Sequence, residues 1–346
     1  FSLEGFAFFT EAIFLGIYLY GWGRISKKAH FAAGVVVAIS GAASALFVLS
    51  VNGWMNSPRG FIPGDAGSAA VIDPVAAMTN PFWIANTIHM LIAAYVATAF
   101  GAATIHAFKV LQGSRAELHR KGLTIAAGFG ALMALLQPLS GDVSARLVAR
   151  EQPAKLAAME AHFETSACAP LRLGGWPDEA TGTVRWDVEI PCGLSLLVDR
   201  DPGAVITGLN DIPLDERPPV APVHVAFQIM VGIGTFLAGL GLWVLVTLVR
   251  RRPLAEAPRL ALWGLVAAGP LAFIAIQAGW TVTEVGRQPW IIYGVMRTAD
   301  AVTPMPGLAV PFASFTLLYL MLSVVVIGLM RRIARIEDDE AAVALP

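Results

Sequence analysis

A carboxylate and a guanidinium stand three residues apart where an apolar run of the sequence ends. Glu284 and Arg287 lie in the stretch 279–290, which follows directly on the apolar residues 260–280. Ionisable groups at the edge of a membrane segment are costly, so they indicate function and each should have a partner. Arg287 is one candidate partner of Glu284. A buried iron is another, because a carboxylate can serve as a metal ligand.

A histidine and a methionine in two other apolar segments have the chemistry of a haem-iron ligand pair. His89 lies in segment 82–108 and Met230 in segment 223–249. An imidazole and a thioether together ligate low-spin haem iron, and the thioether raises its reduction potential. Each residue also has a plain structural interpretation, because a membrane histidine often hydrogen-bonds within the core and a methionine often only packs.

Two acids in the first apolar segment fall on one side of a helix. Glu4 and Glu11 are seven residues apart, which is close to two helical turns. Stacked acids within a bilayer are typical of a proton relay. The alternative for Glu4 is a solvated helix end at the water boundary, whereas Glu11 lies deeper.

The composition is that of an integral membrane protein. Hydrophobic residues make up 56% of the chain and charged residues only 14%, with a mean hydropathy of +0.65. Soluble domains carry roughly 25% charged residues. The net charge is −1 and no basic stretch is long enough to indicate nucleic acid binding. The chain begins at Phe1 without a signal-peptide pattern, so we expect it to start inside a longer protein.

Seven apolar segments approach the ~20 residues that a bilayer-spanning helix needs, so we expect an all-α membrane fold. They cover residues 3–22, 31–51, 82–108, 122–140, 223–249, 260–280 and 309–330. Basic residues concentrate at 24–28, 109–121, 250–259 and 331–335. By the positive-inside rule these four places are cytoplasmic, so the first helix runs inward. The chain then divides into four helices (1–140), an external loop (141–222), and three helices with a short cytoplasmic tail (223–346).

This orientation places the five candidate groups in the outer half of the membrane. At ~1.5 Å of rise per residue, His89 lies about 12 Å and Met230 about 10 Å from the outer ends of their helices. Glu284 lies at the outer boundary, and Glu4 and Glu11 lie in the first half of an inward-running helix.

The external loop is polar, rich in Pro and Gly, and long enough to indicate function. Residues 152–160 predict a short amphipathic helix. Cys168 and Cys192 both lie in the loop, where an oxidising compartment permits a disulfide. The sequence leaves their pairing open, because it does not give the distance between them.

These residues together resemble subunit I of the cytochrome bd quinol oxidases, across nearly the whole chain and most closely in the branch with a short external loop, the Q loop. The stretches that carry the resemblance are Glu4-Gly with Phe8-Phe-Thr-Glu11, Gly21-Trp-Gly-Arg24 with His30, Ser44-Ala, Asn52-Gly-Trp-Met-Asn56, His89, Lys155-Leu-Ala-Ala-Met-Glu160, Phe227-Gln-Ile-Met230, Gly279-Trp and Gly286-Arg-Gln-Pro-Trp290.

The resemblance implies two haem sites in this chain. His89 and Met230 match the axial ligands of a low-spin haem b. Glu284 matches the ligand of a high-spin haem b, with Trp280 beside it. Arg287 would face the haem propionates or the quinol side.

The resemblance also implies roles in quinol and proton chemistry. Lys155 and Glu160 match quinol-site residues of the Q loop. Glu11, and less closely Glu4, match the acids that feed protons toward haem d, the site of dioxygen reduction.

Three departures from the family pattern are visible. Family members usually have nine spans, and the first two, one of which carries the axial histidine of haem d, are absent here. Glu4 and Glu11 stand seven apart rather than eight, so Glu11, next to Phe8-Phe9, is the better anchored. Gln228 stands where many members have an arginine, which predicts a shifted potential of the low-spin haem.

We therefore expect the catalytic, haem-bearing subunit of a bd-type oxidase of the bacterial cytoplasmic membrane, with the Q loop outside. It would oxidise quinol, reduce dioxygen to water and generate proton-motive force. Its expected partner is subunit II, and the resemblance leaves room for a small accessory subunit. The alternatives are an electron-transfer cytochrome b without oxidase activity and a haem-free transporter, which would also place acids and histidines at one depth.

Overall fold

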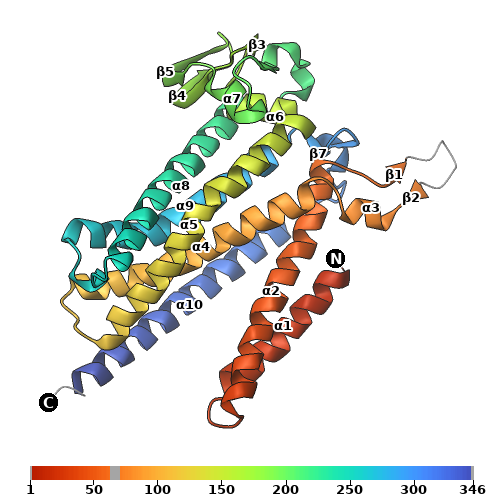
Figure 1. Cartoon of the computed structure of the whole chain (residues 1–346). Helices are drawn as coiled ribbons and strands as arrows, with labels where there is room; N and C mark the ends of the chain where they lie inside the picture. Colours follow the sequence, from red (N-terminus) through yellow and green to blue (C-terminus); the bar gives the residue numbers. More distant parts are fainter. Residues whose placement is uncertain (1, 63–70, 344–346) are drawn as a thin grey trace. The chain divides into compact units, whose positions relative to one another are not determined.

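The computed structural model describes residues 2–62 and 71–343, with side chains up to residue 332 (Figure 1). Within these residues, seven helical segments are long and apolar enough to cross a membrane, which confirms the all-α expectation. The helices that carry them are α1 (Ser2–Tyr20), α2 (Lys27–Asn56), α4 (Phe82–Leu111), α5 (Glu117–Glu151), α8 (Val220–Val249), α9 (Arg259–Val285) and α10 (Ala309–Val343).

The short elements lie in the connections. Four antiparallel pairs of strands are formed: β1 (Phe61–Ile62) with β2 (Val71–Ile72), β3 (Ser166–Ala167) with β6 (Val205–Ile206), β4 (Leu171–Asp178) with β5 (Thr183–Ile190), and β7 (Trp290–Ile292) with β8 (Met296–Arg297). The short helices are α3 (Pro74–Met78), α6 (Pro153–Met159), α7 (Gly193–Asp199) and the 3-10 turns η1 (Leu209–Asp211), η2 (Leu214–Glu216), η3 (Leu254–Glu256) and η4 (Thr298–Ala301).

Helices α4, α5, α8 and α9 pack into one bundle, and small residues line its contacts. Ala103, Ala107 and Ala127 are fully buried there. A Cβ atom on Gly241 of α8 would lie 3.0 Å from the carbonyl oxygen of Ala131 on α5. Membrane helices associate through such close packing, because lipid gives no hydrophobic drive to bring them together. Helix α2 packs against α4, and α1 packs against α2.

Helix α5 is longer than the sequence predicts. The predicted span ends at Ser140, but the helix continues to Glu151. The extension consists largely of residues that tolerate a helix, and Arg146 pairs with Asp142 one turn earlier at 2.7 Å. The helix therefore carries its last three turns beyond the apolar segment and into the loop region.

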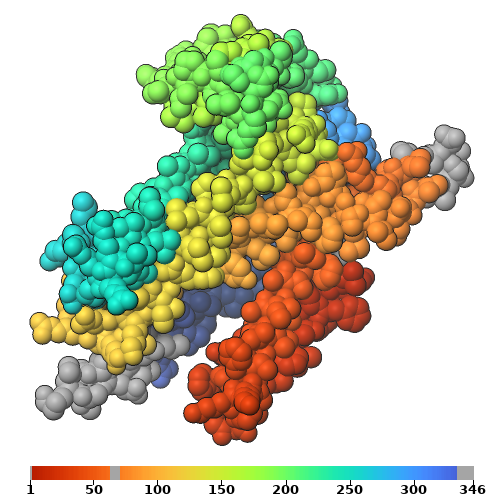
Figure 2. Space-filling view, viewed as in Figure 1, coloured from red at the N-terminus to blue at the C-terminus, as the bar shows by residue number. Residues whose placement is uncertain are grey.

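The loop between α5 and α8 folds into a cap, shown in green at one end of α5 and α8 in Figure 2. The expected helix in 152–160 is present as α6, but the expectation that it is amphipathic is wrong. Residues 155–159 are all buried, because α6 packs against α5, α8 and η1. Cys168 and Cys192 form a disulfide, which resolves the pairing that the sequence left open.

The described residues from Ala301 onward form a second compact unit, and α10 is its long helix. The described side chains of α10, up to residue 332, are exposed in the isolated chain.

Candidate functional site

The end of α9 forms a charged cluster with α2. Asn52 of α2 donates a hydrogen bond from Nδ2 to Oε1 of Glu284 at 2.8 Å. Arg287 donates from Nη2 to the other carboxylate oxygen. The expected partnership of Glu284 with Arg287 is thus confirmed. Arg287 is only 3% exposed, and burial lowers the pKa of its guanidinium.

Lys155 of α6 joins this cluster through a second asparagine. Its Nζ donates to Oδ1 of Asn56 at 2.7 Å, and Asn56 donates from Nδ2 to Oδ1 of Asn52 at 3.2 Å as well as to its carbonyl oxygen at 2.8 Å. Gln152 donates to the carbonyl oxygen of Asn56 at 2.8 Å. A chain of hydrogen bonds therefore runs from Lys155 through two asparagines to Glu284. Burial lowers the pKa of Lys155 to about 7, and the nearby positive charge of Arg287 adds to this effect.

Glu160 lies at the other end of α6, in different surroundings. Its side chain is 2% exposed, and its Oε2 has no hydrogen-bond partner within the described part of the chain. Burial raises the pKa of the carboxyl to about 8, against the opposing effect of the Arg172 guanidinium.

The structure separates Lys155 from Glu160. At ~100° per residue, five residues of helix turn the two side chains about 140° apart. Lys155 faces α2 and the end of α9, whereas Glu160 faces the loop strand β4.

His89 projects from α4 toward α5. Its Nδ1 lies 2.9 Å from Oγ of Ser140, and its Nε2 lies 3.1 Å from Nε2 of Gln137. Both partners are on α5. The hydroxyl of Ser140 holds Nδ1, so Nε2 is the nitrogen suited to bind a metal once the Gln137 amide, its present neighbour, moves aside.

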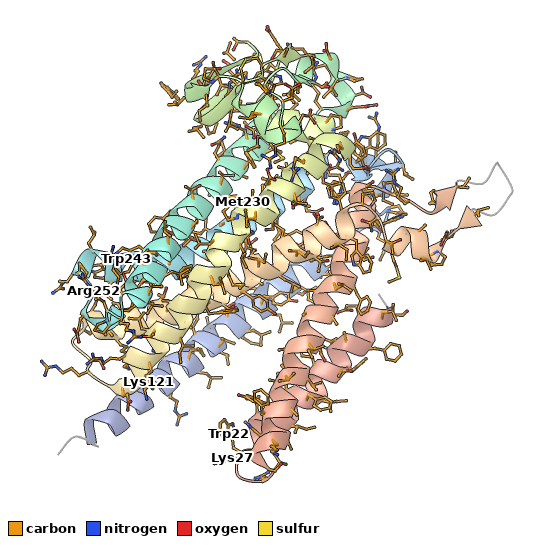
Figure 3. All side chains as sticks on the ribbon, in the orientation of Figure 1. Trp22, Lys27, Lys121, Met230, Trp243 and Arg252 are labelled. Atoms are coloured by element: carbon orange, nitrogen blue, oxygen red, sulfur yellow. A yellow bond between two sulfur atoms is a disulfide. The ribbon has the colours of Figure 1, made fainter. Side chains whose placement is uncertain are left out.

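Met230 projects from α8 (labelled in Figure 3) toward α9. A Cβ atom on Gly279 of α9 would lie 3.1 Å from the Met230 sulfur, so the glycine lets the thioether pack closely against α9. Helices α4 and α8 are both neighbours of α5 and α9. His89 and Met230 therefore belong to two helices of the same four-helix bundle. Trp280, next to Gly279, is half-buried.

Glu4 and Glu11 both face α2. Ser44 donates a hydrogen bond from Oγ to Oε1 of Glu4 at 3.2 Å, and a Cβ atom on Gly41 would lie 3.5 Å from Oε2 of Glu11. Both acids are half-buried. The expectation that they share one face of a helix is confirmed.

Comparison with known proteins assigns the chain to a family. The family model for cytochrome bd terminal oxidase subunit I matches residues 1–338. The chain belongs to this family. It is 36% identical over 334 residues to a putative cytochrome bd menaquinol oxidase subunit I of Bacillus subtilis (strain 168), covering 94% of this chain and 74% of the relative. It is 28% identical over 401 residues to cytochrome bd-II ubiquinol oxidase subunit 1 of Escherichia coli (strain K12), covering 95% and 77%.

A solved structure agrees with this assignment. The bd oxidase of Geobacillus thermodenitrificans matches with a TM-score of 0.88 and 43% identity, covering 96% of this chain and 76% of that chain. The chain is thus a multi-pass membrane subunit of a terminal oxidase. The activity class of the family is a quinol:dioxygen oxidoreductase, and haem is its cofactor.

The residues of this oxidase subunit fit haem. Imidazole, thioether and carboxylate are all donors suited to iron. Two nitrogens of the buried Arg287, Nε and Nη1, lack a hydrogen-bond partner in the described residues. Buried charged donors need acceptors, and a haem propionate supplies them.

Several polar residues of the site had no assigned role in the sequence. These are neutral amides and a hydroxyl. Four of them bind ionisable side chains, namely Asn52, Asn56, Gln137 and Ser140, and Gln152 binds the backbone of Asn56. A signal was available for the first two, because asparagines four residues apart in an apolar segment lie on one helical face.

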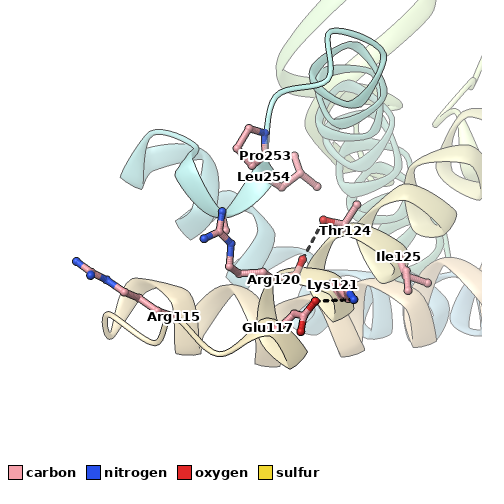
Figure 4. Close-up of a pocket in the computed structure, with 9 residues that line it drawn as sticks. Arg115, Glu117, Arg120, Lys121, Thr124, Ile125, Pro253 and Leu254 are labelled. Carbon is pink, nitrogen blue, oxygen red and sulfur yellow. Dashed lines mark hydrogen bonds and ion pairs between the residues drawn. The ribbon is translucent and has the colours of Figure 1, made fainter. Parts of the chain in front are cut away.

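A cavity of about 500 Å³ lies at the opposite end of the bundle, away from these residues (Figure 4). Lys121 pairs there with Glu117 at 2.6 Å, and Arg120 pairs with Glu256 at 3.0 Å. The basic residues of this cavity are among those that the sequence places on the cytoplasmic side. None of the candidate site residues lines the cavity. It is lined by Arg115, Glu117, Arg120, Lys121, Thr124, Ile125, Pro253, Leu254 and Ala255.

Proposed function

We propose that this chain is the haem-bearing catalytic subunit that oxidises quinol beside the cap and passes the electrons inward to dioxygen. The observation that carries the proposal is the hydrogen-bonded path from Lys155 through Asn56 and Asn52 to Glu284. It joins the loop region to a membrane carboxylate through buried polar groups, which are costly in an apolar protein unless they are used.

In this proposal, the metal-binding groups divide between two sites. His89 and Met230 hold a low-spin haem b, while Glu284, with Trp280 beside it, holds a high-spin haem b. Arg287 offers its two unpartnered nitrogens to a propionate. Haem, when bound, supplies the electron carriers and the iron that reduces dioxygen.

Glu160 and Lys155 act on quinol. Oxidation of one quinol to quinone releases two electrons and two protons, and the protons need an acceptor at the site. The Glu160 carboxylate accepts one proton, since its raised pKa of about 8 makes it a strong base for a carboxylate. Lys155, with a pKa of about 7, takes either protonation state near neutral pH, and Asn56 fixes its amine in place.

Glu11 and Glu4 supply protons for water formation. Two quinols and one dioxygen give two quinones and two waters, so protons must reach the dioxygen site as they are consumed. The two acids lie on one face of α1, and Ser44 extends the polar path from Glu4 into α2. Acids aligned in this way within a membrane segment are suited to relay protons.

The assembly follows the family. Haem d is the third haem of the complex. Subunit II is the partner, with room for a small accessory subunit. The cap lies on the outer side of the bacterial cytoplasmic membrane. Since the relatives include a menaquinol and a ubiquinol oxidase, the substrate is one of these quinols.

A reduced-minus-oxidised absorption spectrum of membranes that contain the assembled oxidase, together with quinol-driven oxygen uptake, tests this proposal. We expect b-type bands, a long-wavelength d-type band and oxygen consumption with quinol. Haem bands without oxygen uptake would instead indicate an electron-carrying cytochrome b. Well-expressed protein without a haem signal would contradict the ligand assignments.

A further inference from the structure

The hairpin β4–β5 is docked onto α8 by two side chains one helical turn apart. Gln228 accepts a hydrogen bond at Oε1 from the backbone N–H of Gly174 and donates from Nε2 to the carbonyl oxygen of Arg172, both at 3.0 Å. Nε2 of His224 lies 3.0 Å from the carbonyl oxygen of Gly174, and its Nδ1 lies 2.8 Å from that of Met159. Helix α8 thereby fixes strand β4 against the end of α6.

This docking presents the Arg172 guanidinium to the segment that contains Glu160. Nη1 of Arg172 donates to the carbonyl oxygen of Ala161 at 2.9 Å. Its other nitrogens pair with two carboxylates of β5, Asp187 at 3.1 Å and Glu189 at 2.9 Å. The Arg172 side chain is 18% exposed. A half-buried guanidinium held by these three residues has little freedom to move, so its charge stays next to the segment that contains Glu160.

Within the described residues, other titratable groups lie on the elements that pack against α6, including Asp211 on η1. The segment that contains Glu160 contributes His162 and Glu164, and α8 contributes His224, which binds the carbonyl oxygen of the residue before Glu160. Strand β5 contributes the two carboxylates that pair with Arg172. Arg172 is the group whose charge acts on the Glu160 carboxyl, and it opposes the effect of burial. An opposite charge at such range favours the ionised form of an acid.

We propose that Arg172 is a positioning residue for the quinol-side proton acceptor, stabilising the ionised form of Glu160 from a hairpin that α8 and two carboxylates hold in place. The inference rests on the proposed role of Glu160 in accepting a proton from quinol. In this arrangement Asp187 and Glu189 moderate the effect of Arg172, because they offset part of its charge.

The test is the pH profile of quinol oxidation by the assembled oxidase in membranes. Oxygen uptake is measured with decylubiquinol and with menadiol, and quinol autoxidation is subtracted. Arg172→Gln should move the midpoint of the rise in kcat/KM up by about one pH unit, which is about a tenfold loss on the acidic side. The activity should recover at alkaline pH, whereas a merely structural defect would lower it at every pH. Arg172→Lys should keep most of the wild-type profile.

A second variant is expected to shift the midpoint of the pH profile in the opposite direction. Damage to the hairpin would not explain opposite shifts in the two variants. Asp187→Asn removes one compensating charge from Arg172 and should move the midpoint down. The matched control is Arg185→Gln on the same hairpin, because Arg185 is 61% exposed and pairs with Asp178 at 2.8 Å. Its profile should equal that of the wild type. An unmoved midpoint in Arg172→Gln, or a shift of Asp187→Asn toward alkaline pH, would overturn the inference.

Glu160→Gln separates this inference from the function on which it rests. Loss of turnover in Glu160→Gln, with an unchanged pH profile in Arg172→Gln, would contradict the proposed role of Arg172 and support that of Glu160. Wild-type turnover and a wild-type pH profile in Glu160→Gln would contradict the proposed roles of both residues. The reduced haem spectrum of each variant should match that of the wild type, since none of these residues is a proposed haem ligand.

Discussion

The two ends of α6 bury opposite charges in opposite ways. Lys155 is held by the side-chain amide of Asn56 on α2, and hydrogen bonds lead from its amine to Glu284. Glu160 is held beside a loop hairpin, with one carboxylate oxygen unpartnered in the described chain and a guanidinium close by. Burial shifts both groups toward their neutral forms, to pKa values of about 7 and about 8. The difference teaches that the helix bundle positions the first group, while the cap positions the second.

The largest expected effect comes from replacing Met230, the proposed haem ligand on α8, which leaves both ends of α6 intact. Met230→Leu keeps the volume roughly constant but deletes the sulfur, so the low-spin haem should become high-spin or be lost. Quinol-driven oxygen uptake should fall by more than the ~10–100-fold that is typical of residues that support a ligand. The reduced spectrum is the measurement, and an unchanged spectrum would rule out this ligand assignment.

The next largest effect is expected when Glu160, the group positioned by the cap, is replaced. Glu160→Ala should lower kcat/KM for quinol by about a hundredfold, which is typical for loss of a general base, and should leave the haem content unchanged. In the wild type, the carboxyl is protonated below about pH 8 and ionised above it, so kcat/KM should rise as pH rises through that value. Haem loss with normal turnover per remaining haem would contradict the assignment.

A smaller effect is expected when Asn56, the partner of Lys155 on the helix bundle, is replaced. Asn56→Leu removes the acceptor of the Lys155 amine, so the pKa of Lys155 should fall below its value of about 7. Because the charged amine then loses its partner, quinol oxidation should drop by about tenfold. The backbone acceptor of Gln152 stays in place.

A matched control for this variant lies on a neighbouring connection. Asn80 is equally buried and donates to the carbonyl oxygen of Ser50 at 2.9 Å, outside the cluster. Asn80→Leu should cost stability, about 1–3 kcal/mol, while kcat/KM per haem stays normal. Equal activity losses in the two variants would mean that Asn56 has only a structural role.

The smallest effect concerns the contact between the two regions. Gln228 lies two residues before Met230 and also binds strand β4. Gln228→Arg adds a positive charge near the proposed low-spin haem site and should shift the midpoint potential of that haem. The same change removes the hydrogen bonds between the Gln228 amide and strand β4, which contribute about 1 kcal/mol of stability. A redox titration of both proteins measures the shift, and equal potentials would contradict the expectation.

Much of the candidate site followed from the sequence, because single residues in apolar segments are conspicuous. Glu284, His89 and Met230 were candidates by residue type and expected depth, and their proposed roles as ligands rest on the family resemblance. The partnership of Glu284 with Arg287 followed from their spacing of three residues, which is a local property of a helix. The roles of Asn56 and Arg172 could not be predicted in this way. Neutral amides carry no distinctive signal, and Arg172 resembles any polar loop residue until the hairpin is docked.

The sequence by itself determined the membrane class, the helical spans and the chemistry of the donors. These depend on composition and on periodicity along one segment. Only the tertiary structure decided that Lys155 and Glu160 serve two different neighbourhoods, that α5 continues into the cap, and that Asn52 meets Glu284 across 232 residues of chain. The physical reason is that buried polar groups must find partners, and in a bundle those partners come from segments far apart in sequence.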